Sequence, residues 1–152
     1  MEYRYKNFRF PVKANDVGKY FEDLHNTFGE IDPKVVVEKA REESNLLHNC
    51  FEWQDDIAAE KYRIHQARQL IRCVVVVEDD KQIETRAFVN VSFSEGQPNA
   101  YHTTSVVLQN EYSRDLLLKQ AKKDIDTFQT KYKSLNELSD VLNAMESFRN
   151  DS

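Results

Sequence analysis

The feature that most constrains the fold is a change in the spacing of apolar residues at Cys73. Before this point, apolar residues recur every three or four positions, which is typical of helices with one buried side. After it, residues 73–77 form an apolar run without a polar interruption, which predicts a central strand. The chain is therefore expected to pack helices against a sheet.

The sheet is predicted to be an antiparallel meander that continues beyond this first strand. Apolar and polar residues alternate over residues 83–93, which is the clearest strand signal in the chain. Residues 78–81 and 94–99 have the composition of turns, and residues 101–108 supply a third strand. Helices are expected to cover one face of this three-stranded sheet, and the N-terminal segment can add a fourth strand.

Two helices are predicted near the N-terminus. Residues 15–28 have helical spacing and end at Gly29, which suits a left-handed cap. Asp32 and Pro33 then begin a second helix with an acidic N-cap and a proline in the first turn. The pair resembles a helix-turn-helix in outline, but the charges of the second helix are balanced and include acids at its end. A plain helical hairpin is the favoured interpretation.

The predicted helix that leads to Cys73 begins at Asp55 and Asp56, whose charges suit the positive end of a helix dipole. Phe51 and Trp53 precede it, and Trp53 is the only tryptophan of the chain. We expect these two rings to anchor a loop against the base of the helix.

One side of this helix is basic. Helical spacing places Lys61, His65, Arg68 and Arg72 together, with Arg63 nearby in the sequence. Two interpretations remain open. The cations contact phosphate or the carboxylates of a partner, or they form an ordinary solvated helix face.

The same stretch carries a resemblance to known sequences. The matching residues are Leu47-His48, Phe51-Glu52-Trp53, Asp55, Ala58-Ala59-Glu60, Tyr62-Arg63, Gln66-Ala67-Arg68 and Leu70-Ile71-Arg72. This pattern resembles a small family of uncharacterised bacteriophage and prophage proteins, closely over the central third of the chain and loosely over the rest. The resemblance implies a phage-like origin and assigns no activity. Leu46 and Gln54 depart from the pattern, which has proline and an acidic residue at these positions.

Residues 3–10 interleave aromatic and basic side chains. Arg4, Lys6 and Arg9 alternate with tyrosine and phenylalanine, and such rings can stack on bases while the cations meet phosphates. The same alternation suits an edge strand whose cations discourage pairing with another sheet. Both interpretations remain open.

Residues 111–148 are predicted to be helical. The apolar residues that recur at steps of three or four are Leu117, Ala121, Ile125, Phe128, Tyr132, Leu135, Leu138, Leu142 and Met145. Ser134 and Glu137 have the spacing of a capping box, which predicts a break near Lys133. Because the apolar stripe can also pack on a second subunit, a homodimer through this tail is one prediction.

Composition places the chain among ordinary soluble proteins. A chain of 152 residues suits one domain, and three Gly with three Pro argue against disorder. The net charge of −5 disfavours a protein that coats nucleic acid indiscriminately. Cys50 and Cys73 are too few for a disulfide framework, and no apolar run approaches the roughly 20 residues that cross a bilayer. We therefore expect a cytoplasmic protein, in the host cell if it is phage-encoded.

Signals for catalysis are weak. The scattered glycines form no phosphate-binding loop, and no cofactor is expected. His48, Cys50, Glu52 and Asp55 are residue types that ligate zinc or manganese, but no second His or Cys pair stands at zinc-finger spacing. His48 is better explained by a hydrogen bond to the backbone. No catalytic residue is assigned.

The sequence thus predicts a single α+β domain over residues 1–152, helical over 15–72, a β-meander over 73–108 and a helical tail over 111–148. The leading hypothesis is a non-enzymatic, phage-type protein that binds a host or phage protein. The alternatives are a nucleic-acid-binding accessory or regulatory protein, and a metal-dependent hydrolase around His48 and Glu52. The candidate contact residues for a partner protein or nucleic acid are Lys61, Arg63, His65, Arg68, Arg72, Phe51, Trp53, Arg4, Lys6 and Arg9.

Overall fold

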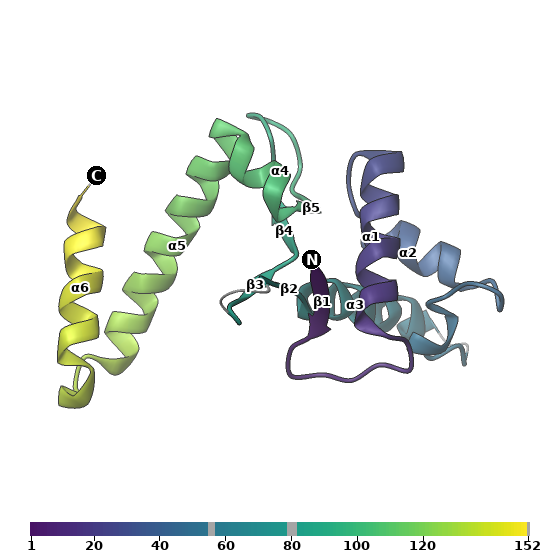
Figure 1. Ribbon diagram of the computed structural model, residues 1–152, viewed down its shortest axis with the longest axis horizontal. Coiled ribbons are helices and arrows are strands. Elements are labelled where there is room, and N and C mark those ends of the chain that lie inside the picture. The colour runs from purple at the N-terminus through teal and green to yellow at the C-terminus, as the bar shows by residue number, and fades with distance from the viewer. Residues whose placement is uncertain (55–56, 79–81, 152) are drawn as a thin grey trace.

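The computed structural model describes residues 1–54, 57–78 and 82–151 and has an α+β fold (Figure 1). Its elements are β1 (Glu2–Tyr5), α1 (Ala14–Phe28), α2 (Pro33–Ala40), η1 (His48–Cys50), α3 (Ile57–Cys73), β2 (Val74–Val77), β3 (Glu84–Arg86), β4 (Phe88–Val91), β5 (Ala100–Thr103), α4 (Thr104–Gln109), α5 (Glu111–Tyr132), η2 (Asn136–Leu138) and α6 (Ser139–Asn150). The predicted class and a three-stranded antiparallel sheet are confirmed. Asp55, Asp56 and residues 79–81, predicted to open a helix and form a turn, lie outside the described residues.

The two N-terminal helices begin and end where local signals predict. Gly29 takes a φ of 77° after α1 and donates its N–H to the carbonyl of His25 (2.8 Å). Asp32 caps α2, because its carboxylate accepts a hydrogen bond from the N–H of Lys34 (2.8 Å). Pro33 occupies the first helical position, where its missing N–H costs nothing. Both predicted helices are confirmed, and α2 packs mainly against α3 rather than against α1.

Strand β2 is the centre of the three-stranded sheet, as its apolar run predicts. It pairs antiparallel with β1 and with β3, so that Val76 lies opposite both Tyr3 and Thr85. Val74 and Val77 are buried, as expected for a strand with neighbours on both edges. The N-terminal aromatic and basic segment therefore supplies an edge strand.

The single strand predicted over residues 83–93 is two strands in two sheets, which corrects the meander. Its first part is β3, and its second part is β4, which pairs with β5 in a separate sheet. The junction is Ala87, whose N–H donates to the carbonyl of Val74 (3.2 Å) and whose carbonyl accepts from the N–H of Thr104 (3.0 Å). The alternation of apolar and polar residues runs through Ala87 without interruption, so it carries no sign of the change of sheet.

Residues 104–108 belong to helix α4, which corrects the end of the predicted third strand. The hydroxyl of Thr104 donates to the carbonyl of Arg86 (2.5 Å), and this bond turns the chain out of the strand. Ser113 is buried in the first turn of α5, and its hydroxyl donates to the carbonyl of Val107 (2.8 Å). The β-branched residues of this segment favour a strand locally, and the tertiary contacts override that preference.

The core lies between α1, α3 and the sheets. The rings of Phe21 and Phe88 are fully buried and meet nearly at right angles, with centroids 5.6 Å apart. Tyr3 packs on α1 at Gly18, where the missing side chain leaves room for the ring. The N–H of Tyr3 donates to the side-chain oxygen of Asn15 (2.7 Å), so the edge strand is fixed to this helix.

A buried pair of histidines joins α1 to β5. The Nε2 atom of His25 and the Nδ1 atom of His102 lie 3.2 Å apart, and the residues are 8% and 6% exposed. One ring nitrogen donates and the other accepts, so this bond persists when both imidazoles are neutral. Burial lowers the pKa of His25; burial and, to a lesser extent, the charge of His25 lower the pKa of His102.

Acidification is therefore expected to destabilise the protein through this pair. Below about pH 6.5 the unfolded histidines take up protons, whereas the folded pair resists protonation down to its lowered pKa. The free energy of unfolding is therefore not reduced by this pair above about pH 6.5, and it declines as the pH falls toward the lowered pKa of the folded histidines. Thermal unfolding between about pH 7.5 and about pH 5.5 measures this decline. This loss of stability at low pH should be smaller in His102→Gln and unchanged in His65→Gln, whose ring is exposed. An unchanged loss in His102→Gln would contradict its assignment to the histidine pair.

The C-terminal tail is two helices, and the predicted break near Lys133 is confirmed. Helix α5 ends at Tyr132 and α6 begins at Ser139, with η2 between them. The predicted capping box of Ser134 and Glu137 does not start α6, because its N-cap is Leu138, which makes no side-chain cap bond. The chain turns through a 3₁₀ segment instead.

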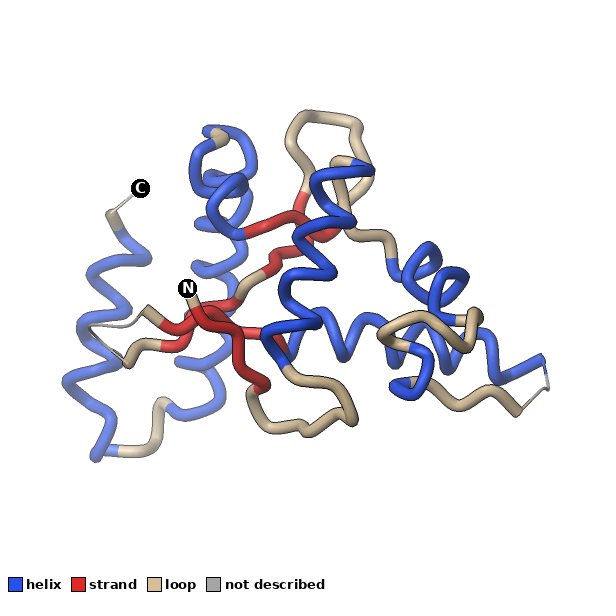
Figure 2. The backbone as a smooth tube through the Cα atoms, turned by 45° about the vertical axis from the view of Figure 1, so that its right-hand side comes forward, coloured by secondary structure: helices blue, strands red, loops and turns tan. Residues whose placement is uncertain are grey.

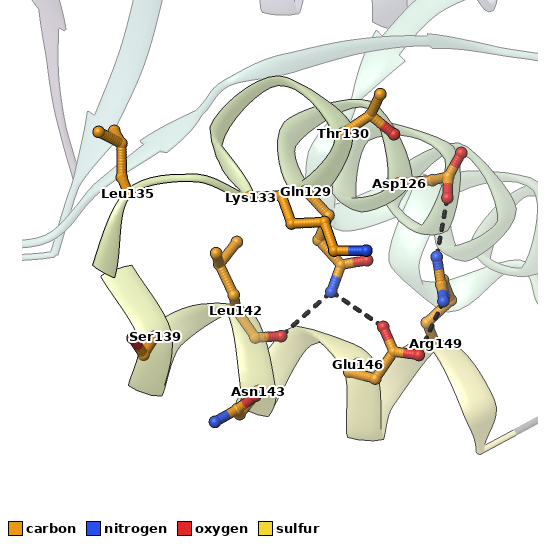
Figure 3. A pocket seen from close by; sticks show the side chains of 10 residues that line it. All are labelled: Asp126, Gln129, Thr130, Lys133, Leu135, Ser139, Leu142, Asn143, Glu146 and Arg149. Atoms are coloured by element: carbon orange, nitrogen blue, oxygen red, sulfur yellow. Dashed lines mark hydrogen bonds and ion pairs between the residues drawn. The ribbon is translucent and has the colours of Figure 1, made fainter. Parts of the chain in front are cut away.

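Polar contacts fasten α6 to α5 (Figure 3). The side-chain amide of Gln129 donates to the carbonyl of Leu142 (3.1 Å) and to the carboxylate of Glu146 (3.2 Å). Arg149 forms an ion pair with Asp126 (2.8 Å). No residue of α6 is buried. Figures 1 and 2 show the hairpin that α5 and α6 form apart from helices α1, α2 and α3.

Candidate functional site

The ring of Trp53 is held by residues of its own chain. It stacks on His48 with centroids 5.2 Å apart, and its Nε1–H donates to the backbone carbonyl of that residue (2.8 Å). The ring of Phe51 lies 5.6 Å away, and the guanidinium of Arg63 lies 5.0 Å from the Trp53 centroid. The expected anchoring of the loop against α3 is confirmed.

Arg63 ties this loop to the helix. It is 2% exposed. Its Nε–H donates to the carbonyl of Glu52 (2.8 Å), and its Nη2 donates to the carbonyl of Gln54 (3.3 Å). The carboxylate of Glu60 lies 3.4 Å from Nη1. Arg63 was predicted as a contact residue for a partner, and its burial separates it from the exposed cations of the same helix.

The candidates for metal binding are engaged elsewhere or lie outside the described residues. The Nδ1–H of His48 donates to the carbonyl of Ala40 (2.8 Å), which is the predicted backbone bond. Burial raises the pKa of the Cys50 thiol to about 11 and that of Cys73 to about 12, so both are protonated at neutral pH. Asp55 is not described. Within the described ranges, no three His, Cys, Asp or Glu side chains are grouped so that they could hold a metal ion.

The basic side of α3 has the arrangement that its spacing predicts. Lys61, His65, Arg68 and Arg72 are all exposed. Arg68 lines a hollow of about 280 Å³ beside the start of α2. Arg72, one turn further along, lines a larger groove, so Arg68 and Arg72 face different hollows.

This larger groove, called the basic groove below, has a volume of about 760 Å³ and lies between the end of α3, strand β4 and the middle of α5. Its cationic side chains are Arg72, Arg86, Lys119, Lys122 and Lys123. Aliphatic side chains that line it are Val89, Val91, Leu116 and Leu117. Among the described residues, one carboxylate lines it, that of Asp124. The basic groove therefore combines positive charge with an apolar floor.

Sequence reasoning did not single out the lysines of this groove. Lys119, Lys122 and Lys123 stand at helical spacing, which alone signals a basic patch on a helix. Their partners Arg72 and Arg86 come from α3 and β3, far away in the sequence, and only the fold brings the five together.

A second hollow of about 480 Å³ adjoins the basic groove, because Arg72 and Arg86 line both. It is also lined by Lys6, so the structure joins one cation of the N-terminal segment to α3. Arg4 instead forms an ion pair within β1 (3.0 Å), and Arg9 is exposed on the following loop. The three predicted cations of this segment thus have different surroundings.

The hollow of about 490 Å³ between α5 and α6 differs from the basic groove in its charge (Figure 3). Lys133 and Arg149 line it, and Arg149 is paired with Asp126 and with Glu146, at 2.8 Å each. A side-chain oxygen of Gln129 is buried there without a hydrogen-bond partner. Because its charges are largely paired within the hairpin, this hollow has no evident preference for a charged ligand.

Comparison with protein-family models, with curated proteins and with solved structures gives no match for this chain. Among the helices that the structure describes, none has both the length and the apolar character needed to cross a membrane.

Proposed function

We propose that the protein is a non-enzymatic binding protein that takes an acidic, amphipathic segment of a partner protein into the basic groove. The observation that carries this proposal is the set of five cations around an aliphatic floor with one carboxylate. A helix with acids beside an apolar stripe complements both features, since its apolar side chains leave water while its acids meet the cations.

The floor of the groove favours a protein over nucleic acid. Sites for single strands stack bases on exposed aromatic rings, whereas Val89, Leu116 and Leu117 are aliphatic. The aromatic residue that lines the groove, Tyr101, is 6% exposed and has little ring surface to offer.

Other features agree with a binding role. Both thiols are protonated at neutral pH and are therefore poor nucleophiles. His48, the centre of the metal-hydrolase alternative, is occupied by its backbone bond and its stacking on Trp53. The phage-like origin inferred from residues 46–72 makes a host or phage protein the natural partner, and the exposed apolar residues of the tail leave room for the predicted homodimer.

A labelled synthetic helix with leucine at helical spacing and glutamate elsewhere tests the groove by fluorescence anisotropy. We expect salt-sensitive binding that weakens at least about tenfold, equivalent to about 1.4 kcal/mol, in Lys119→Glu with Lys123→Glu. The matched control is Lys131→Glu with Lys133→Glu, which changes the charge equally at the C-terminal end of α5 and just after it, away from the basic groove. This control should bind as the wild type does.

Two outcomes overturn the proposal. One is equal weakening in both double variants, which means that only the net charge matters. The other is absence of peptide binding together with binding of a labelled single-stranded DNA that the Lys119 and Lys123 changes abolish, which favours the nucleic-acid alternative.

A further inference from the structure

The side of α6 that points away from α5 is acidic and apolar. Asp140, Val141, Ala144 and, at the border, Phe148 are exposed at helical spacing on one side of the helix, and exposed Asp151 follows directly after the helix ends at Asn150. Val141 is 48% exposed and Phe148 is 40% exposed. This side, called the acidic side of α6 below, is an acidic amphipathic surface of the kind that the basic groove complements.

The acidic side of α6 meets the basic groove of its own molecule at its border, where the ring of Phe148 faces Lys122 (5.5 Å). The opposite side of the helix is fastened to α5 through Leu142, Glu146 and Arg149, which contact Gln129 and Asp126. Figure 1 shows α6 at the outer edge of the hairpin, with α5 next to the strands. A helix fixed in this way leaves its acidic side available to another molecule.

We propose that the occupant of the basic groove is α6 of a second copy of this chain, so that the protein is a homodimer. This inference rests on the proposed function, and it names the partner. Asp140 and Asp151 meet cations of the groove, while Val141 and Ala144 cover its aliphatic floor. Phe148 lies at the edge of this contact, where its own ring already faces Lys122 (5.5 Å).

Each copy carries one basic groove and one α6. When each copy places its α6 in the groove of the other, the same contact is made twice around a two-fold axis and neither groove is left for a third copy. The chain separates its charges accordingly, with five cations gathered in the groove and acids on the outer side of α6. The dimer is held by charge as well as by apolar contact, so salt weakens it.

Light-scattering mass across a dilution series tests the dimer. The groove variant is Lys119→Glu with Lys123→Glu, and the helix variant is Asp140→Lys with Asp151→Lys. Each is expected to have the mass of a monomer where the wild type has that of a dimer. An equimolar mixture of the two is expected to recover the dimer mass, because the two new glutamates of one groove meet the two new lysines of the partner helix, and the unchanged basic groove still meets an unchanged acidic helix.

The control is Lys131→Glu with Lys133→Glu, which should remain a dimer, and circular dichroism of every variant checks the fold. A dimer that persists in both the groove and helix variants overturns the inference, as does an assembly larger than two copies. A monomeric wild type that still binds the synthetic acidic helix overturns the inference alone and leaves the proposed function standing. If the wild type is monomeric and binds no acidic helix, both fail.

Discussion

Replacing Gly18 by alanine is expected to destabilise the protein by about 3 kcal/mol, the upper part of the range for overpacking a core. A Cβ atom at Gly18 would lie 2.2 Å from the Cγ atom of the Tyr3 ring, a distance that neither atom tolerates. The ring cannot retreat easily, because the N–H of Tyr3 is held by Asn15 (2.7 Å) and its hydroxyl by Glu22. Helix propensity favours alanine by about 1 kcal/mol, so the clash outweighs it. Urea denaturation followed by circular dichroism measures the loss.

Gly96→Ala provides the comparison for Gly18→Ala. Nothing lies within 4 Å of a Cβ at Gly96, so its cost of about 1 kcal/mol comes from the φ of +80° alone. Adding Tyr3→Ala to Gly18→Ala should make the second substitution much less costly, because the ring that the Cβ meets has been removed. Equal losses in Gly18→Ala and Gly96→Ala would contradict the close packing.

The helices near the N-terminus could be predicted because their signals are local. Gly29 and Asp32 act within one turn of their own positions, through the left-handed cap and the hydrogen bond to Lys34. The split at Ala87 could not be predicted in this way. Its cause is a pair of hydrogen bonds to Val74 and Thr104, which are distant in sequence, and the alternating pattern is the same with or without them.

The residues of the candidate site also differ in whether local sequence signals predict their surroundings. The exposed cations of α3 follow from helical spacing, and the structure places Arg68 and Arg72 as expected. Charge alone does not separate these from Arg63, whose burial depends on a loop that folds back over the helix. For Arg41, no signal in the sequence indicated the contacts that the structure shows. It was not a candidate, yet it forms an ion pair with Glu60 and lies 5.6 Å from the ring of Trp53.

Removing the guanidinium in Arg63→Ala is expected to cost about 3 kcal/mol, within the range for breaking a buried charge network. The change deprives the carbonyls of Glu52 and Gln54 of their donor and removes the cation from the ring of Trp53. Because Trp53 is the only tryptophan, its fluorescence reports the loop directly during urea denaturation. Arg68→Ala is the control and should change stability by about 0.5 kcal/mol or less, since Arg68 is exposed.

Arg63→Lys separates a structural role from contact with a partner. Lysine keeps the charge but donates from a single nitrogen instead of a planar fork, so it fits the two carbonyls less well and part of the stability is lost. Binding of the synthetic acidic helix should be unchanged while the variant is folded, because Arg63 lies near the start of α3 and the groove residue Arg72 lies near its end. Weaker binding with unchanged stability is the result that would make Arg63 a contact residue. Unchanged binding with reduced stability means that the loop requires Arg63 and the partner does not.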